Sequence, residues 1–165
     1  SLSGRTGSTI QSADSRRTRI LPVMSLRICL KMNDLQTIKK IFKMNTIAVV
    51  GMSPNPKRPS HYVALYLREQ DYEIIPVNPD HEKIAGMDCY PDLESIPDSI
   101  DVVNIFRRSE FVPLIVDSAI AIGAKAIWMQ DTVIHEKAGK KAEEAGLMVV
   151  MNDCMLRQHR KSFYI

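Results

Sequence analysis

The chain has 165 residues, of which 45% are hydrophobic and 25% charged, a composition typical of one globular domain with a single core. No apolar run approaches the ~20 residues that a membrane span requires. Three widely spaced cysteines, Cys29, Cys89 and Cys154, exclude both a disulfide framework and a C-x-x-C pair and indicate a reducing, cytoplasmic location. The net charge of +3 is uneven, because residues 1–45 carry +7 and the remainder −4. The basic pI is therefore not evidence that the folded domain binds nucleic acid.

Residues 1–31 are rich in Ser, Thr and Arg, contain Asp14 as their only acid, and show no apolar periodicity. We expect this basic extension not to pack, and we place the folded domain at residues 32–165. Three interpretations of the extension stay open. It is a tag or an over-long reading frame with the start at Met24 or Met32, a disordered basic tail, or an organelle transit peptide.

Apolar strands alternate with helical patterns along the rest of the chain. Residues 80–98 are the exception and are predicted to be irregular, with one helical turn at 92–95. Helices are predicted at 35–42, 61–70, 109–122, 131–145 and 154–161. Strands are predicted at 47–50, 73–77, 101–106, 126–130 and 147–151. The pattern predicts an α/β, doubly wound, five-stranded parallel sheet with helices on both faces and strand order 3-2-1-4-5.

The segment after the first strand is the most informative. The strand ends at Gly51, and a proline-rich basic loop leads into a helix. This is typical of a nucleotide-binding unit, in which backbone N–H groups and a helix N-terminus face a phosphate. Gly51 fills the first glycine of G-x-G-x-x-G, but Ser53 and Pro56 occupy the other two positions, which disfavours close approach to an NAD pyrophosphate. The absence of G-x-x-x-x-G-K-[ST] excludes ATP bound in a P-loop.

In such a sheet the ligand lies outside the carboxyl ends of the strands, near the switch between the first and fourth strands. The residues that follow the strands are Gly51, Met52, Ser53, Lys57, Arg58, Asn78, Pro79, Phe106, Arg107, Arg108, Gln130, Asp131, Asn152, Asp153 and Cys154. Four basic side chains from two loops make this edge cationic, and arginine can hold phosphate oxygens bidentately. The alternative is that they are solvated loop cations. Asn78 and Pro79 stand where an acid would bind an NAD ribose, so the sequence predicts a phosphate-rich ligand other than NAD or P-loop ATP.

Five motifs together resemble a known family: Gly-x-Ser-x-x-Pro-x-Arg-Pro-Ser at 51–60, Pro-Val-Asn-Pro at 76–79, Phe-Arg-Arg at 106–108, Ile-Gly-Ala-Lys-Ala at 122–126 and Cys-x-x-x-x-His at 154–159. Over about residues 33–160 the chain resembles the small stand-alone coenzyme A-binding proteins. Their Rossmann-like domain is similar to the N-terminal domain of the succinyl-CoA synthetase α-subunit. The phosphohistidine and nucleotide-grasp domains of the synthetase have no counterpart in these 165 residues, so we do not expect a complete acyl-CoA ligase.

The resemblance implies coenzyme A, or an acyl-CoA, bound across the strand ends. The three phosphate groups of that ligand would account for convergent arginines and a missing ribose acid. The loop at 51–54, which includes Pro54, would meet the pyrophosphate. The nucleotide and pantetheine would be flanked by Asn78, Pro79, Phe106, Arg107, Trp128, Met129 and Gln130. Trp128 is interpreted as core or pocket wall.

A non-catalytic or regulatory coenzyme A-binding protein is the first hypothesis. The others are an NAD(H)-sensing module, a thioester enzyme that uses Cys154, and a nucleic-acid binder acting through residues 1–45. Cys154 and His159 are five residues apart, so on a helix they point about 140° apart, which favours a packed thiol and a surface imidazole. The other histidines lack metal-ligand spacing, and we assign no metal. We expect no membrane association, and a protein partner or homodimer is left open.

Overall fold

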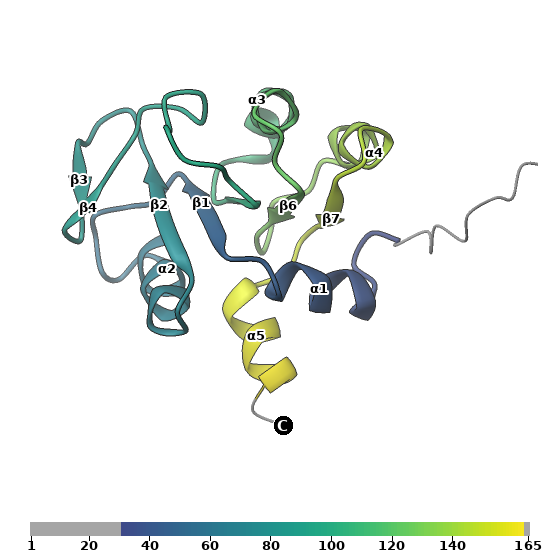
Figure 1. Cartoon of the computed structure of the whole chain (residues 1–165), viewed down its shortest axis with the longest axis horizontal. Helices are drawn as coiled ribbons and strands as arrows, with labels where there is room; N and C mark the ends of the chain where they lie inside the picture. The colour runs from purple at the N-terminus through teal and green to yellow at the C-terminus, as the bar shows by residue number, and fades with distance from the viewer. Residues whose placement is uncertain (1–30, 164–165) are drawn as a thin grey trace, which may run out of the picture.

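The structure is a computed structural model that describes residues 31–163, so most of the predicted N-terminal extension lies outside the described residues. Five parallel strands form the central sheet (Figure 1): β1 (Thr46–Val50), β2 (Glu73–Val77), β5 (Val102–Ile105), β6 (Ala126–Met129) and β7 (Met148–Val150). Every predicted strand is present, and the predicted Rossmann-like α/β class is confirmed.

The predicted strand order is wrong. In sequence order the strands run 2-1-3-4-5, because the sheet order is β2-β1-β5-β6-β7. The third strand pairs with β1, in the register Ile47↔Val102, instead of with β2. Polar contacts outside the strands fix this neighbour: Asp101 Oδ2 accepts the N–H groups of Asn45 and Thr46 at 3.0 and 3.1 Å, which holds the start of β5 beside the start of β1. The apolar pattern of a strand does not indicate which other strand lies beside it in the sheet.

The changed order moves the switch point. It lies between β1 and β5, so the loops that follow these two adjacent strands meet at one place on the carboxyl edge.

Helices cover both faces of the sheet (Figure 1). One face carries α1 (Leu35–Phe42), α2 (Pro59–Glu69) and α5 (Met155–Phe163), and the other carries α3 (Val112–Ala121) and α4 (Glu136–Glu144). Successive strand residues supply two separate cores. Ile47, Val49 and Trp128 pack on the first face, and Ala48, Val103 and Met129 pack on the second. This alternation is why the strands read as continuous apolar runs.

The connections differ from the sequence prediction in their details. Residues 78–101 hold a short hairpin of β3 (Lys83–Ile84) and β4 (Met87–Asp88), which was not predicted. The predicted helical turn at 92–95 is a side-chain turn, in which Asp92 Oδ1 accepts from the backbone N–H and the hydroxyl of Ser95 at 2.8 and 2.6 Å.

Two helix starts also differ. A short 3-10 helix, η1 (Ser109–Phe111), precedes α3. Helix α4 begins only at Glu136, where His135 Nδ1 accepts from the N–H of Ala138 at 3.1 Å. Residues 131 and 132 form a turn, in which Thr132 takes a left-handed φ of 71°, and residues 133–135 have no regular structure.

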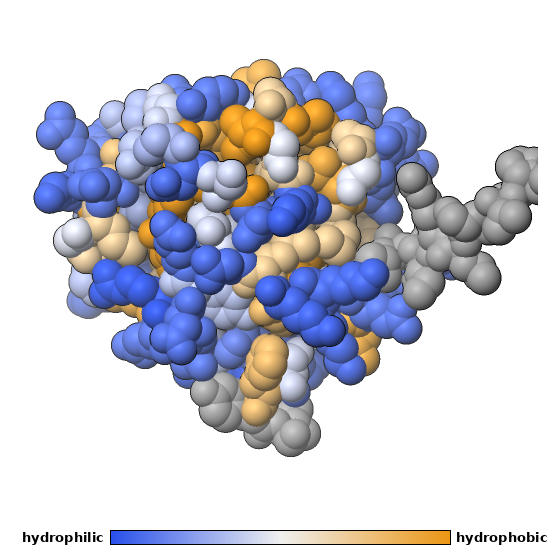
Figure 2. Space-filling model, in the orientation of Figure 1, coloured by the Kyte–Doolittle hydropathy of each residue, from blue (hydrophilic) through white to orange (hydrophobic). Residues whose placement is uncertain are grey.

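Within residues 31–163, no helix has the length and apolar character needed to cross a bilayer. Figure 2 shows hydrophilic side chains over most of one face of the molecule, with apolar surface toward the side that carries α3 in Figure 1.

Candidate ligand site at the carboxyl edge of the sheet

Gly51 allows the loops after β1 and β5 to approach each other. Its φ of +85° lies in the left-handed region, and its N–H donates to the carbonyl of Val77 at 2.9 Å. A Cβ at this position would lie 2.9 Å from Cδ of Arg107 and 3.1 Å from the carbonyl oxygen of Phe106. A side chain here would therefore displace Arg107.

The loop between Gly51 and α2 is braced by its own polar groups. The N–H of Ser53 donates to Ser60 Oγ at 2.9 Å, and the N–H of Asn55 donates to Ser53 Oγ at 3.1 Å. The N–H groups of Lys57 and Arg58 both donate to Asn55, to Oδ1 and to the carbonyl oxygen, at 3.0 Å. These four amides are occupied within the loop, and α2 begins with a proline, which has no N–H. These four N–H groups are therefore not open to a ligand as the loop stands, and the expectation that backbone N–H groups here face a phosphate stays a prediction for the rest of the loop and the start of α2.

A large cavity of about 750 Å³ opens above the ends of β1, β5 and β6. Arg58 from the first loop and Arg107 and Arg108 from the second all line it. The predicted convergence of arginines from separate loops on one edge is thus confirmed. The remaining lining residues are Gly51, Ser53, Pro59, Ser60, Tyr62, Phe106, Ser109, Gln130, Asp131, Thr132, Val133 and Cys154.

A smaller cavity of about 250 Å³ adjoins the first and shares Gly51 and Arg107 with it. The guanidinium of Arg107 lies over the ring of Phe111, 4.6 Å from its centroid, so Arg107 stands between the two cavities. The smaller cavity is mostly apolar and is further lined by Val50, Val77, Asn78, Pro79, Pro91, Asp92, Leu93, Phe111, Leu114, Ile115 and Ser118.

Residues 45–160 match the family model of the CoA binding domain. The chain belongs to this family. The resemblance seen in the motifs is thereby confirmed. Over 123 residues the chain is 37% identical to the uncharacterized protein YneT of Bacillus subtilis (strain 168). This match covers 74% of this chain and 91% of YneT. Over 108 residues it is 28% identical to the ADP-forming acetate–CoA ligase II of Archaeoglobus fulgidus. That match covers 64% of this chain and 16% of the ligase.

Solved structures share the fold of this CoA-binding domain. A hypothetical protein from Pyrococcus horikoshii OT3 is 41% identical with a TM-score of 0.74, over 76% of this chain and 89% of that one. The Thermus thermophilus protein cell-free ID.343 is 31% identical with a TM-score of 0.74, over 80% of this chain and 100% of that one.

Several predicted site residues lie away from the cavities of this CoA-binding domain. The side chains of Met52, Trp128 and Met129 are fully buried in the two cores, and Trp128 Nε1 donates to the carbonyl of Asp153 at 2.9 Å. Pro54 and Lys57 are exposed and line neither cavity. We therefore leave these five out of the proposed site. Sequence position placed them at the strand ends, but the side-chain alternation of a strand and the course of the loop decided where they point.

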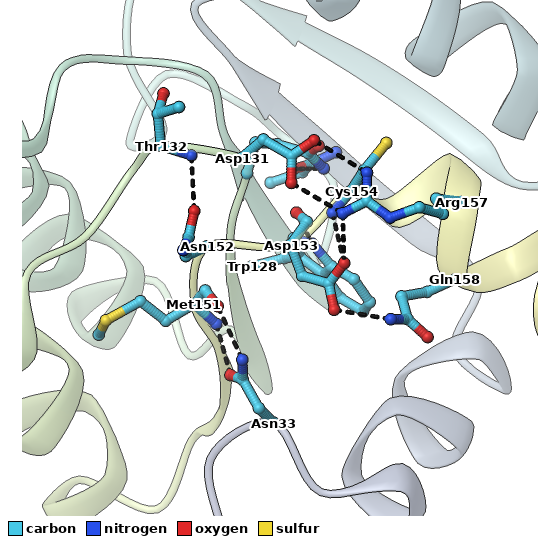
Figure 3. Close-up of polar contacts among 12 residues, drawn as sticks. Asn33, Trp128, Asp131, Thr132, Met151, Asn152, Asp153, Cys154, Arg157 and Gln158 are labelled. Carbon is cyan, nitrogen blue, oxygen red and sulfur yellow. Dashed lines mark hydrogen bonds and ion pairs between the residues drawn. The ribbon is translucent and has the colours of Figure 1, made fainter.

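The side chain of Asn152 also makes its hydrogen bond outside the two cavities. It lies after β7 with a left-handed φ of 54°, and its Oδ1 accepts the N–H of Thr132 at 2.8 Å (Figure 3). It lines neither cavity and instead holds the turn that carries Thr132. Gln130, by contrast, does line the large cavity. It is 3% exposed and donates to Asn104 Oδ1 at 2.8 Å, which fixes its amide.

The end of β2 carries no carboxylate into the site. The Asn78 amide donates to the carbonyl of Met52 at 3.0 Å and accepts the N–H of Asp80 at 2.9 Å, and Asp80 itself is exposed. The acid of the smaller cavity is Asp92 instead. Sequence reasoning missed Asp92 and Phe111 because neither directly follows a strand.

Cys154 and His159 do not form a pair. Cys154 lines the large cavity just before α5 begins. His159 is buried among aromatic rings, and its Nδ1 lies 2.8 Å from the hydroxyl of Tyr66. Burial lowers the pKa of His159. The expectation of a surface imidazole is therefore wrong, although the predicted separation of the two side chains holds.

An ion-pair network joins the large cavity to α5 (Figure 3). Arg157 donates from Nη1 and Nη2 to the two carboxylate oxygens of Asp131 at 3.1 and 2.8 Å, and from Nη2 to Asp153 at 2.8 Å. Hydrogen bonds from Arg157 hold the pKa of Asp131 below its ordinary value, against the raising effect of partial burial.

Proposed function

We propose that this chain binds coenzyme A, free or acylated, at the cavities above Gly51, in a non-catalytic or regulatory role. The observation that carries the proposal is that Arg58 and Arg107, from the loops after adjacent strands, line one cavity. Because four amides of the first loop are occupied within it, we place the phosphates at these guanidinium groups. Family membership and the matched ligases, which are named for a reaction of acetate with CoA, support this ligand.

We assign different parts of coenzyme A to the two cavities, because one is small and mostly apolar and the other is larger and lined by arginines. We place the adenine in the smaller apolar cavity beside Phe111 and the phosphates across Gly51, between Arg58 and Arg107. The pantetheine then extends into the large cavity toward Gln130 and Cys154. The volume of about 750 Å³ lies within the range of about 300–1,000 Å³ for ligand sites, and the smaller cavity, at about 250 Å³, lies just below it.

A binding role is preferred to catalysis because the described residues that line the large cavity include no imidazole that could act as a base for the thiol of Cys154. Cys154 is the nucleophile that lines the cavity, and the imidazole that follows it in sequence, His159, is held by Tyr66 in the core. A thioester enzyme acting through Cys154 would lose turnover in Cys154→Ala, whereas a binding protein would keep its affinity for coenzyme A.

An NAD(H)-binding module is the second candidate, and Asp92 favours it. A carboxylate in an apolar nucleotide pocket can accept the ribose hydroxyls of NAD. One of its oxygens already accepts two hydrogen bonds from Ser95, which reduces its capacity for a ribose. The 3′-phosphate distinguishes the two ligands, since NAD has none.

Thermal unfolding with added ligand tests the proposal. Coenzyme A should raise the melting temperature, since a ligand at 100 times its Kd stabilises the native state by about 2.7 kcal/mol. 3′-Dephospho-coenzyme A should act more weakly, and NAD(H), NADP(H) and ATP weaker still. No shift at millimolar coenzyme A, or an equal shift with NAD(H), would contradict the proposal.

A further inference from the structure

The large cavity contains an acid as well as its arginines. Among the described residues that line it, Asp131 is the carboxylate, and it stands with Arg58, Arg107 and Arg108 around the same space. Its lowered pKa means that it is ionised at neutral pH. An ionised carboxylate on the wall of a site for phosphates would repel the ligand if nothing neutralised it.

The neutralising group comes from outside the cavity. Arg157 lies in the first turn of α5, does not line the cavity, and faces both oxygens of Asp131 (Figure 3). This paired geometry is the strongest that arginine and a carboxylate form. The guanidinium is thus placed where it cancels the charge of Asp131 without taking a place at the ligand.

The third member of the network, Asp153, depends less on Arg157. Asp153 Oδ2 accepts from Gln158 Nε2 at 2.7 Å, and its Oδ1 accepts the N–H of Cys154 at 2.8 Å. Its side chain is 17% exposed, and it does not line the cavity. Of the two acids, Asp131 is therefore the one whose charge at the site is set by Arg157.

We infer that Arg157 is a positioning residue for ligand binding: it masks the charge of Asp131, so that the arginines of the cavity attract phosphate unopposed. The inference rests on the proposed function and names the electrostatic control of that site. It also makes the docking of α5 part of the binding site, because a displaced α5 would expose the Asp131 charge to the ligand.

Isothermal titration with coenzyme A tests this in five forms of the 165-residue chain: wild type, Arg157→Gln, Arg157→Lys, Asp131→Asn and the Arg157→Gln/Asp131→Asn double variant. Arg157→Gln should raise the Kd by about three- to tenfold, and raising the ionic strength should shrink this difference between variant and wild type. Asp131→Asn should bind as tightly as wild type or tighter, since it removes the negative charge from the cavity wall while Arg157 keeps its ion pair with Asp153. The double variant should return to within about twofold of wild type. Arg157→Lys should bind more tightly than Arg157→Gln.

Each outcome decides the inference. A merely structural role for Arg157 predicts a double variant as weak as Arg157→Gln, and that result would overturn the inference, as would an unchanged Kd in Arg157→Gln. If Arg157→Gln proves too unstable to titrate, Asp131→Asn still decides, because weaker binding by that variant would contradict charge masking. Failure of wild type to bind coenzyme A defeats the proposed function and this inference together. Failure of the variants alone defeats only the inference.

Discussion

At the scale of single residues, the backbone conformation of Gly51 and its lack of a side chain shape the proposed ligand site. Its left-handed φ disfavours any side chain, and a Cβ would press on Arg107 as well. Gly123 offers a matched control, since its φ is +76° but no atom lies within 4 Å of a Cβ built there.

Gly51→Ala should lower the free energy of unfolding by more than Gly123→Ala does. The left-handed conformation alone costs an alanine about 1–2 kcal/mol. Crowding against Arg107 should add to this cost and weaken coenzyme A binding, which Gly123→Ala should leave unchanged. Urea denaturation and a ligand titration measure both effects. Equal losses in the two variants would show that the contact with Arg107 is unimportant.

Single residues also show how far the sequence could predict the site. Arg58, Arg107 and Gln130 were predicted and line the cavity, because Arg107 and Gln130 lie within two residues of the ends of β5 and β6 and Arg58 lies in the loop after β1. Trp128 and Met129 were expected at the site from the family resemblance, and they are buried because they lie within β6 itself. Asp92 and Phe111 lie in segments whose path depends on tertiary packing, so no local pattern marked them.

At the scale of elements, Asp101 connects β5 to β1. Burial alone would raise the pKa of Asp101, but hydrogen bonds from the N–H groups of Asn45 and Thr46, and Lys125 at 3.2 Å, outweigh it and hold the pKa below its ordinary value. A carboxyl group whose pKa is lower in the folded than in the unfolded state stabilises the fold above its unfolded pKa of about 3.9. That contribution is lost as the pH falls through the folded pKa.

Asp101→Asn should therefore destabilise the protein by about 1.5–3 kcal/mol at neutral pH, the range for hydrogen bonds to a charged group. The loss of stability between about pH 5 and about pH 2 should be smaller in the variant than in wild type. Asp88→Asn is the control, because Asp88 pairs with Lys83 at 3.8 Å on the surface with its side chain 75% exposed. Denaturation curves across this pH range measure the difference. Parallel pH profiles for wild type and Asp101→Asn would contradict the assigned role.

The same contact explains the limit of topology prediction. Helix and strand positions followed from apolar periodicity and from glycines such as Gly123 and Gly146, which end helices. The order of strands depends on contacts between distant residues, such as the hydrogen bond between Thr46 and Asp101, 55 positions apart, which a single sequence does not reveal. The corrected order strengthens the site hypothesis, because it makes the loops of Arg58 and Arg107 neighbours.

At the scale of the whole molecule, Asn33 attaches the N-terminal end of the described domain to the segment that contains β7. The Asn33 amide donates to the carbonyl of Met151 and accepts the N–H of Met151, both at 2.7 Å, and its own N–H donates to Val149 at 3.2 Å. It thereby pairs with the edge strand β7 as a further strand residue would.

Removal of residues 1–30 should leave the melting temperature and the Kd for coenzyme A unchanged, because residues 31–163 contain the five strands of the sheet and the two arginines, Arg58 and Arg107, to which we assign the phosphates. Extending the deletion through residue 33 should cost about 2–3 kcal/mol, roughly 1 kcal/mol for each hydrogen bond to β7. Thermal denaturation of the two shortened proteins is the measurement. Loss of coenzyme A binding in the first, shorter deletion would contradict the boundary.

The central claim is that guanidinium groups from two neighbouring loops together hold the phosphates of coenzyme A. The most direct measurement is the Kd of coenzyme A for Arg58→Gln and Arg107→Gln, with Arg68→Gln as control, since Arg68 is an exposed arginine of α2 that lines neither cavity. We expect each of the first two to lose about 1.5–3 kcal/mol of binding free energy and the control to bind as wild type. Losses below about tenfold in both cavity variants, or an equal loss in the control, would contradict the account.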